Sequence, residues 1–136
     1  MTWLKIGCMG TVLLAVGCVV SNDCLFAAET TIPRTVQLTI DYGDGVQKIF
    51  THLSWSEGMT VLGVLEMARR HPRGIEFHHR GQGSTALLLQ IDDLQNKGGR
   101  GHNWIYWVNK NLGKQSFAVE KISVSDHVLW KFGEYE

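Results

Sequence analysis

Cysteine is scarce in this sequence and confined to one end. All 3 cysteines, Cys8, Cys18 and Cys24, lie within residues 1–28. A chain cleaved after residue 28 would therefore contain neither a disulfide bond nor a cysteine nucleophile. Proline is also rare, with 2 residues, and 44% of the chain is hydrophobic, which excludes a collagen-like or disordered protein.

An excess of charge of either sign is lacking as well. The chain has 13 Lys plus Arg and 13 Asp plus Glu among its 136 residues. Proteins that bind nucleic acid usually carry a basic excess, because contacts with phosphates supply much of their affinity. The balance of charge therefore argues against nucleic acid as a partner, and the length allows a single domain.

Residues 1–28 have the pattern of an export signal. Lys5 is the only charged residue among the first 22, and a mostly apolar run occupies residues 6–20. Ala27 and Ala28 offer small side chains at a cleavage point, and the apolar run is shorter than the roughly 20 residues of a membrane span. We therefore predict a signal peptide over residues 1–28 and an exported domain over residues 29–136, located in the periplasm or outside the cell.

A second processing route starts from one of the cysteines. Residues 15–18, Ala-Val-Gly-Cys, resemble a bacterial lipobox, although the first residue of that motif is usually leucine. This route would attach a lipid to Cys18 and anchor the protein to a membrane. Soluble export, lipidation of Cys18 and retention of the segment as a membrane anchor are the alternatives.

The remaining chain has the periodicities of several strands and one helix. Apolar residues at helical spacing over residues 61–68 predict a helix with Thr60 as its N-cap and Pro72 after its end. Gly63 inside this helix indicates close packing against a sheet. Alternating or continuous apolar runs predict strands over residues 36–40, 48–53, 75–78, 86–91, 104–108 and 127–132.

This order of elements predicts a mixed α+β domain, in which one helix crosses a β-grasp-like sheet. Alternation along residues 104–107 places Trp104 and Tyr106 on one face of the sheet, and Ile105 and Trp107 on the other. A single helix covers only one face, so one of these sets faces solvent, loops or a partner. An exposed set would offer flat apolar area to a planar ligand or to a protein.

Catalytic and metal-ligating patterns are weak. No serine lies in a Gly-x-Ser-x-Gly motif, and neighbouring Asp92 and Asp93 would point to opposite sides of a strand. The same holds for His78 and His79, so a metal site would need His102 to join one of them in space. We therefore expect no metal site and no enzyme, with a small enzyme as the third alternative after two kinds of binding module.

Four segments together resemble the transcobalamin C-terminal-like domain: residues 57–68, 84–94, 103–109 and 124–132. That family includes the small β-domain of vertebrate cobalamin carriers and many bacterial surface domains. The resemblance spans about residues 36–133 and implies a β-grasp-like fold with cobalamin, or a similar flat corrinoid, as the ligand.

The same resemblance implies which residues would contact the ligand. Tyr106 and Trp107, with Trp104 in the same strand, would pack against the corrin ring, and Leu88 or nearby backbone amides would bind its propionamide groups. The carriers enclose cobalamin with a second, helical domain that has no counterpart here, so a partner protein would be needed to cover the ligand. The alternative is a module that binds another envelope protein through a sheet edge or aromatic face, without a small molecule.

Overall fold

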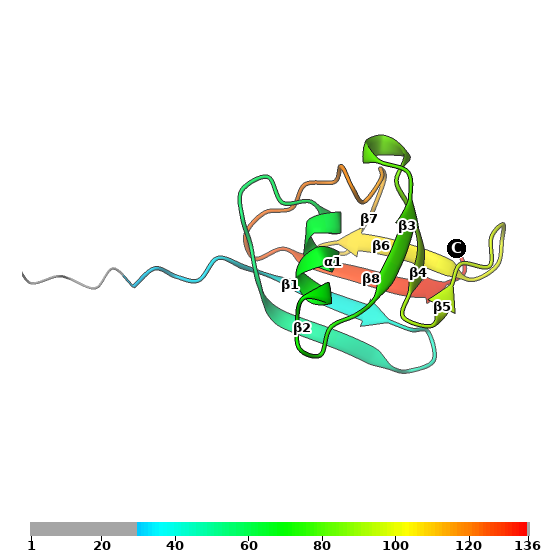
Figure 1. Ribbon diagram of the computed structural model, residues 1–136, viewed down its shortest axis with the longest axis horizontal. Coiled ribbons are helices and arrows are strands. Elements are labelled where there is room, and N and C mark those ends of the chain that lie inside the picture. Colours follow the sequence, from blue (N-terminus) through cyan, green and yellow to red (C-terminus); the bar gives the residue numbers. More distant parts are fainter. Residues whose placement is uncertain (1–29, 136) are drawn as a thin grey trace, which may run out of the picture. The chain divides into compact units, whose positions relative to one another are not determined.

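Within residues 30–135, two β-sheets and one α-helix form the main regular structure (Figure 1). The computed structural model describes residues 30–135, and from Thr31 onward they form one compact unit. The predicted signal peptide of residues 1–28, including Cys18, lies outside the described residues. Within them, no helix has the length and apolar character that crossing a membrane requires.

The larger sheet has five strands: β1 (Thr35–Asp41), β2 (Gln47–Ser54), β6 (Asn103–Val108), β7 (Asn111–Leu112) and β8 (His127–Gly133). Their order in the sheet is β2-β1-β8-β6-β7. Strands β1 and β8 pair in parallel, and all other neighbours are antiparallel, so the sheet is mixed.

The second layer covers one face of this sheet. It contains α1 (Val61–Arg69) and a three-stranded antiparallel sheet of β3 (Phe77–Arg80), β4 (Leu87–Ile91) and β5 (Leu94–Gln95). A short 3₁₀ turn, η1 (Gly83–Thr85), joins β3 to β4. The helix contacts β1 and β2, while β4 contacts β6, so both parts lie over the same face (Figure 1).

The helix begins and ends where the sequence predicts. The Thr60 hydroxyl accepts a hydrogen bond from the Gly63 amide at 3.3 Å, and the last helical residue precedes Pro72 by three positions. The expected packing of Gly63 against the sheet is wrong, because a Cβ there would meet Cγ of Met59 at 3.0 Å. Gly63 therefore leaves room for the side chain of Met59, which precedes the helix, and not for the sheet.

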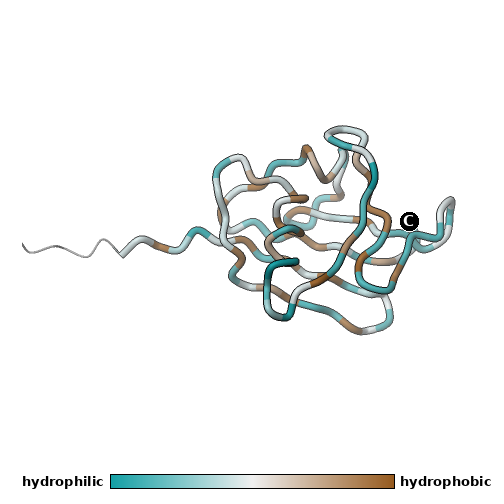
Figure 2. The backbone as a smooth tube through the Cα atoms, in the orientation of Figure 1, coloured by the Kyte–Doolittle hydropathy of each residue, from teal (hydrophilic) through white to brown (hydrophobic). Residues whose placement is uncertain are grey.

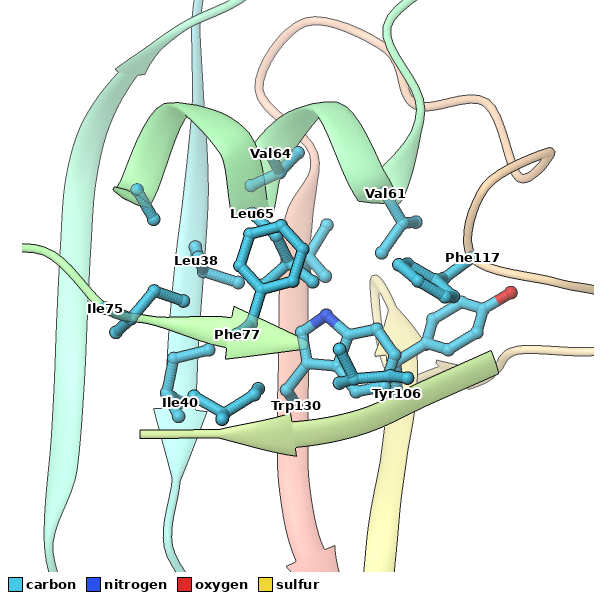
Figure 3. Packing of buried hydrophobic residues seen from close by; sticks show 14 of the residues in the cluster. Leu38, Ile40, Val61, Val64, Leu65, Ile75, Phe77, Tyr106, Phe117 and Trp130 are labelled. Atoms are coloured by element: carbon cyan, nitrogen blue, oxygen red, sulfur yellow. The ribbon is translucent and has the colours of Figure 1, made fainter. Parts of the chain in front are cut away.

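One hydrophobic core lies between the two layers. Figure 3 shows Leu65 of α1 and Phe77 of β3 facing Trp130 of β8, with Tyr106 of β6 beside the indole. Hydrophobic and hydrophilic stretches follow one another along the chain (Figure 2), and in β1 the alternating apolar residues Val36, Leu38 and Ile40 belong to this core. The mixed α+β class with one α-helix, expected from the sequence, is confirmed for the described residues.

Candidate functional site

The face of the large sheet opposite the core carries a row of side chains that crosses all five strands. In the pairing of neighbouring strands, each residue of this row lies opposite the next. From β2 to β7 the row is Ile49, Thr39, Leu129, Trp107 and Leu112. Neighbours in such a row lie close enough for their side chains to pack. Four of the five are apolar, although they face away from the hydrophobic core.

A hollow of about 750 Å³ lies over the β6–β7–β8 end of this row. Its apolar lining comes from Ile105, Trp107, Leu112 and Leu129. The volume lies in the range that small-molecule sites usually have. We call this feature the Trp107 hollow, because Trp107 is the aromatic side chain at its apolar centre and is half-buried in the described chain.

Polar groups of both signs surround the apolar lining. His102, Lys131 and Glu134 contribute to the hollow, and Nδ1 of His102 lies 3.8 Å from Oε1 of Glu134. Tyr135, with 71% of its surface exposed, lines it from the C-terminal segment. The hollow therefore combines a flat apolar surface with both cationic and anionic groups that could orient polar substituents of a ligand.

Alternation along β6 separates the aromatic residues as the sequence predicted. Trp104 and Tyr106 face the core and are 6% and 8% exposed, whereas Ile105 and Trp107 face the hollow. Leu88 of β4 is also buried, at 2%. Of the four candidate ligand contacts, the structure thus places Trp107 in the hollow and the other three inside the protein.

Internal hydrogen bonds hold the two buried aromatic side chains. The Trp104 indole donates to the Leu94 carbonyl at 2.8 Å, and the Tyr106 hydroxyl donates to the Gln115 carbonyl at 2.5 Å. Burial, reinforced by the negative charge of Glu120, raises the pKa of Tyr106 to about 12. These contacts join β6 to neighbouring segments, so a ligand could reach either ring only if those segments moved.

The sequence did not predict Leu129 and Lys131 as parts of the site. Both lie on β8, and pairing of β8 with β6 brings them beside Trp107 and Ile105. Their alternation with the buried Val128 and Trp130 was visible in the sequence, but the identity of the neighbouring strand was not. The sequence suggests His102 only as a metal ligand, whereas the structure places it beside Glu134 and the Phe132 ring.

A second polar cluster lies near the loop between β1 and β2. The Tyr42 hydroxyl donates to Asp92, which also accepts from Lys48 Nζ at 3.1 Å and from the Glu76 amide at 3.0 Å. Burial and this bond to Asp92 raise the pKa of Tyr42 far above its usual value. Burial pushes the pKa of Asp92 upward, but the three hydrogen bonds outweigh it and hold the value below normal.

The histidines do not converge on one point. His79 stacks near Phe77 and contacts the Phe117 ring edge, while His102 lies against Phe132. Within residues 30–135, no three side chains of the His, Cys, Asp or Glu type are placed to hold a metal ion. Asp92 accepts the bonds described above, and Asp93 lies beside it in a small surface pocket.

Comparison with known proteins identifies structural neighbours. The sequence matches no model of a protein family and no curated protein. Among 15 chains of solved structures that match, one is a "putative metal binding protein" from Ruminococcus gnavus ATCC 29149. It shares 13% identity, with a TM-score of 0.60, over 76% of this chain and 99% of its own. At this identity the likeness is one of fold alone.

Proposed function

We propose that this protein is a binding module whose ligand lies flat against Trp107 on the open face of the large sheet. The observation that carries the proposal is the Trp107 hollow itself. An indole and three aliphatic side chains line it, opposite the face that builds the core. Soluble proteins rarely leave such apolar groups together at the surface unless something binds there.

The chemistry of the hollow favours a planar ligand with polar substituents. A half-buried indole offers a flat face for stacking, and Lys131, His102 and Glu134 supply donors and an acceptor around it. A corrinoid such as cobalamin has this form, with a flat ring and amide side chains. An open sheet face covers only one side of such a ligand, so a partner protein would cover the other and raise the affinity.

Fold and sequence likeness support a binding role without fixing the ligand. We propose that the parallel pairing of β1 with β8 beneath one helix is a β-grasp-like arrangement, as in transcobalamin C-terminal-like domains. A structural neighbour whose name describes a metal binding protein is consistent with binding in this fold. Export, directed by residues 1–28 with lipidation of Cys18 as an alternative, would place the module in the periplasm or outside the cell.

The experiment is a titration of the chain, expressed with its own leader and purified as the cell processes it. Cobalamin is added up to millimolar concentration, and the corrin absorbance and tryptophan fluorescence are followed. Trp107→Ala removes the stacking surface and should weaken binding about tenfold, which corresponds to about 1.4 kcal/mol. Leu87→Ala is the matched control, because Leu87 is an apolar side chain, 45% exposed, outside the hollow.

Saturable binding that Trp107→Ala weakens and Leu87→Ala leaves unchanged would support the proposal. No spectral change at millimolar cobalamin would exclude a corrinoid ligand for the isolated chain. Equal weakening by both variants would place the ligand elsewhere and contradict the assignment of the hollow.

A further inference from the structure

The outer edge of β2 is open along the side of the large sheet. Strand order places β2 at the end of the sheet, with β1 as its partner on the other side. Among residues 30–135, no strand pairs with this outer edge. At such an edge every second residue directs its amide and carbonyl outward, so the backbone offers hydrogen bonds to an added strand.

The regular part of this edge is short. Pairing runs without a break from Gln47 to Phe50, and one extra residue in β2 then shifts the register before Leu53. A bulge of this kind bends the strand and interrupts pairing. The edge therefore fits a partner segment of about four or five residues, and the bulge opposes open-ended stacking of strands.

A groove of about 520 Å³ runs beside this edge, between β2 and the segment that follows α1. We call it the β2 groove; it is lined by residues 47–53 of β2 together with His71 and Arg73. The His71 ring packs edge-on against Phe50, with ring centres 5.3 Å apart. Nδ1 of His71 accepts from the Arg73 amide at 3.1 Å, which leaves Nε2 as the donor of the neutral ring.

All ionisable side chains that line the β2 groove are basic: Lys48, His52, His71 and Arg73. Asp92 balances the charge of Lys48 at 3.1 Å. Arg73 is exposed, and in the described part of the chain no carboxylate lies within ion-pair distance of its guanidinium. Among residues 30–135, the groove beside the free edge of β2 therefore holds the unpaired cation of Arg73, the paired Lys48 and two histidines, and no carboxylate lines it.

We propose that the β2 groove binds an acidic peptide segment of another protein, which adds to β2 as a short extra strand. Backbone hydrogen bonds along Gln47–Phe50 would hold the segment. Alternate side chains of the segment would point into the groove, where an Asp or Glu would meet Arg73 and His71. This surface is distinct from the Trp107 hollow, and the inference does not depend on the proposed ligand there.

A second copy of this chain fits the β2 groove less well than an acidic segment. If two copies paired through their β2 edges, Lys48 and His52 of each strand would approach the basic groove of the other. Like charges placed together oppose such pairing. Electrostatic complementarity therefore selects a partner strand that is rich in carboxylates.

The test uses a blocked heptapeptide of the sequence Thr-Val-Glu-Val-Glu-Val-Thr, in which both glutamates point to one side of a strand. It is titrated into the ¹⁵N-labelled chain, and amide shifts are followed by NMR. The control peptides carry lysine in place of glutamate, or N-methyl groups on alternate backbone nitrogens. Expected shifts centre on Gln47–Phe50 and on residues 71–73, with the lysine peptide binding at least fivefold more weakly and the N-methylated peptide not at all.

Charge reversal sharpens the test. Arg73→Glu should weaken the glutamate peptide at least fivefold and strengthen the lysine peptide, because the groove would then favour the opposite charge. Arg100→Glu is the matched control, since Arg100 is also exposed but lies in the loop before β6, away from the groove. Both substitutions are at exposed positions where folding should be preserved.

Selective binding of the glutamate peptide, inverted by Arg73→Glu and unaffected by Arg100→Glu, would support the proposal. It would be overturned by no shifts in β2 at millimolar peptide, by equal binding of the lysine peptide, or by an Arg73→Glu variant that binds like the original. A dimer in sedimentation equilibrium with β2 amides protected from exchange would also overturn it, in favour of pairing between copies.

Discussion

Replacement of Gly113 by alanine should destabilise the protein more than its half-buried position after β7 suggests. A Cβ at this position would lie 2.2 Å from Cζ of Tyr106, with Cε2 at 2.4 Å and Cε1 at 2.5 Å. Ordinary van der Waals contact begins at 3.4 Å, so the ring or the loop must move by about 1.2 Å. The three nearest neighbours of the new atom are atoms of this ring, not the flexible end of a side chain.

The ring has little freedom to move. Its hydroxyl donates to the Gln115 carbonyl, and its centre lies 5.0 Å from that of the Trp130 ring. Overpacking of a core costs about 1–3 kcal/mol. Loss of the hydrogen bond adds about 1 kcal/mol. We therefore expect Gly113→Ala to lower the free energy of unfolding by about 2–4 kcal/mol, with a fall in Tm of about 10–20 °C.

Urea unfolding, followed by tryptophan fluorescence, measures this cost. Gly133→Ala is the control, because a Cβ there meets only the end of the Lys131 side chain at 3.9 Å. A double-mutant cycle with Tyr106→Leu isolates the clash, and in that background Gly113→Ala should cost less than about 1 kcal/mol. A loss within about 0.5 kcal/mol of zero, or the same loss in both backgrounds, would refute the steric reasoning.

Other perturbations test the core, the helix cap and the Asp92 cluster. Leu65→Ala empties a fully buried site and should cost about 3–4 kcal/mol by thermal denaturation, whereas the exposed Leu87→Ala should cost less than about 1 kcal/mol. Thr60→Ala removes the acceptor for the first turn of α1 and should cost about 1 kcal/mol in urea unfolding, while Thr60→Ser should retain most of it. The lowered pKa of Asp92 stabilises the fold above its unfolded pKa of about 3.9, and this contribution is lost as pH falls through the lower folded value. Urea midpoints measured across the acidic range should therefore fall less steeply for Asp92→Asn than for the original chain, and equal slopes would contradict this assignment.

Local elements of the fold were readable in the sequence because their signals are local. Helical spacing over residues 61–68, with Thr60 before it and Pro72 after it, predicted α1 to within one residue at its end. Strands β1, β2, β4 and β8 each fall within two residues of the predicted ranges. The strand expected at residues 75–78 lies instead at Phe77–Arg80, the segment that pairs with β4. The apolar Ile75, which suggested an earlier start, is buried in the loop before the strand.

The sequence did not predict which distant strands pair, and for this reason it did not predict which candidate site residues are buried. Alternation correctly divided Trp104 and Tyr106 from Ile105 and Trp107, but it does not say which face a second layer covers. Strand β4 contacts β6, and this second layer buries the first pair. Leu88 lies in the same layer and is buried with them. The side chains that lie beside Trp107 come instead from its sheet neighbours, Leu129 of β8 and Leu112 of β7.

The central position of β1 and β8 has a consequence for how the protein reaches its native state. The Thr39 hydroxyl and the His127 imidazole are 2.8 Å apart although 88 positions separate them in the chain. The entropy cost of closing a loop of this size must be met before the contacts between the two strands form. This slows folding, as in other topologies of high contact order. Strand β8 can pair with β1 and β6 only after it has left the ribosome, so the middle of the large sheet forms later than the hairpin of β1 and β2 can. A polypeptide that must pass through a membrane unfolded would gain time from this delay.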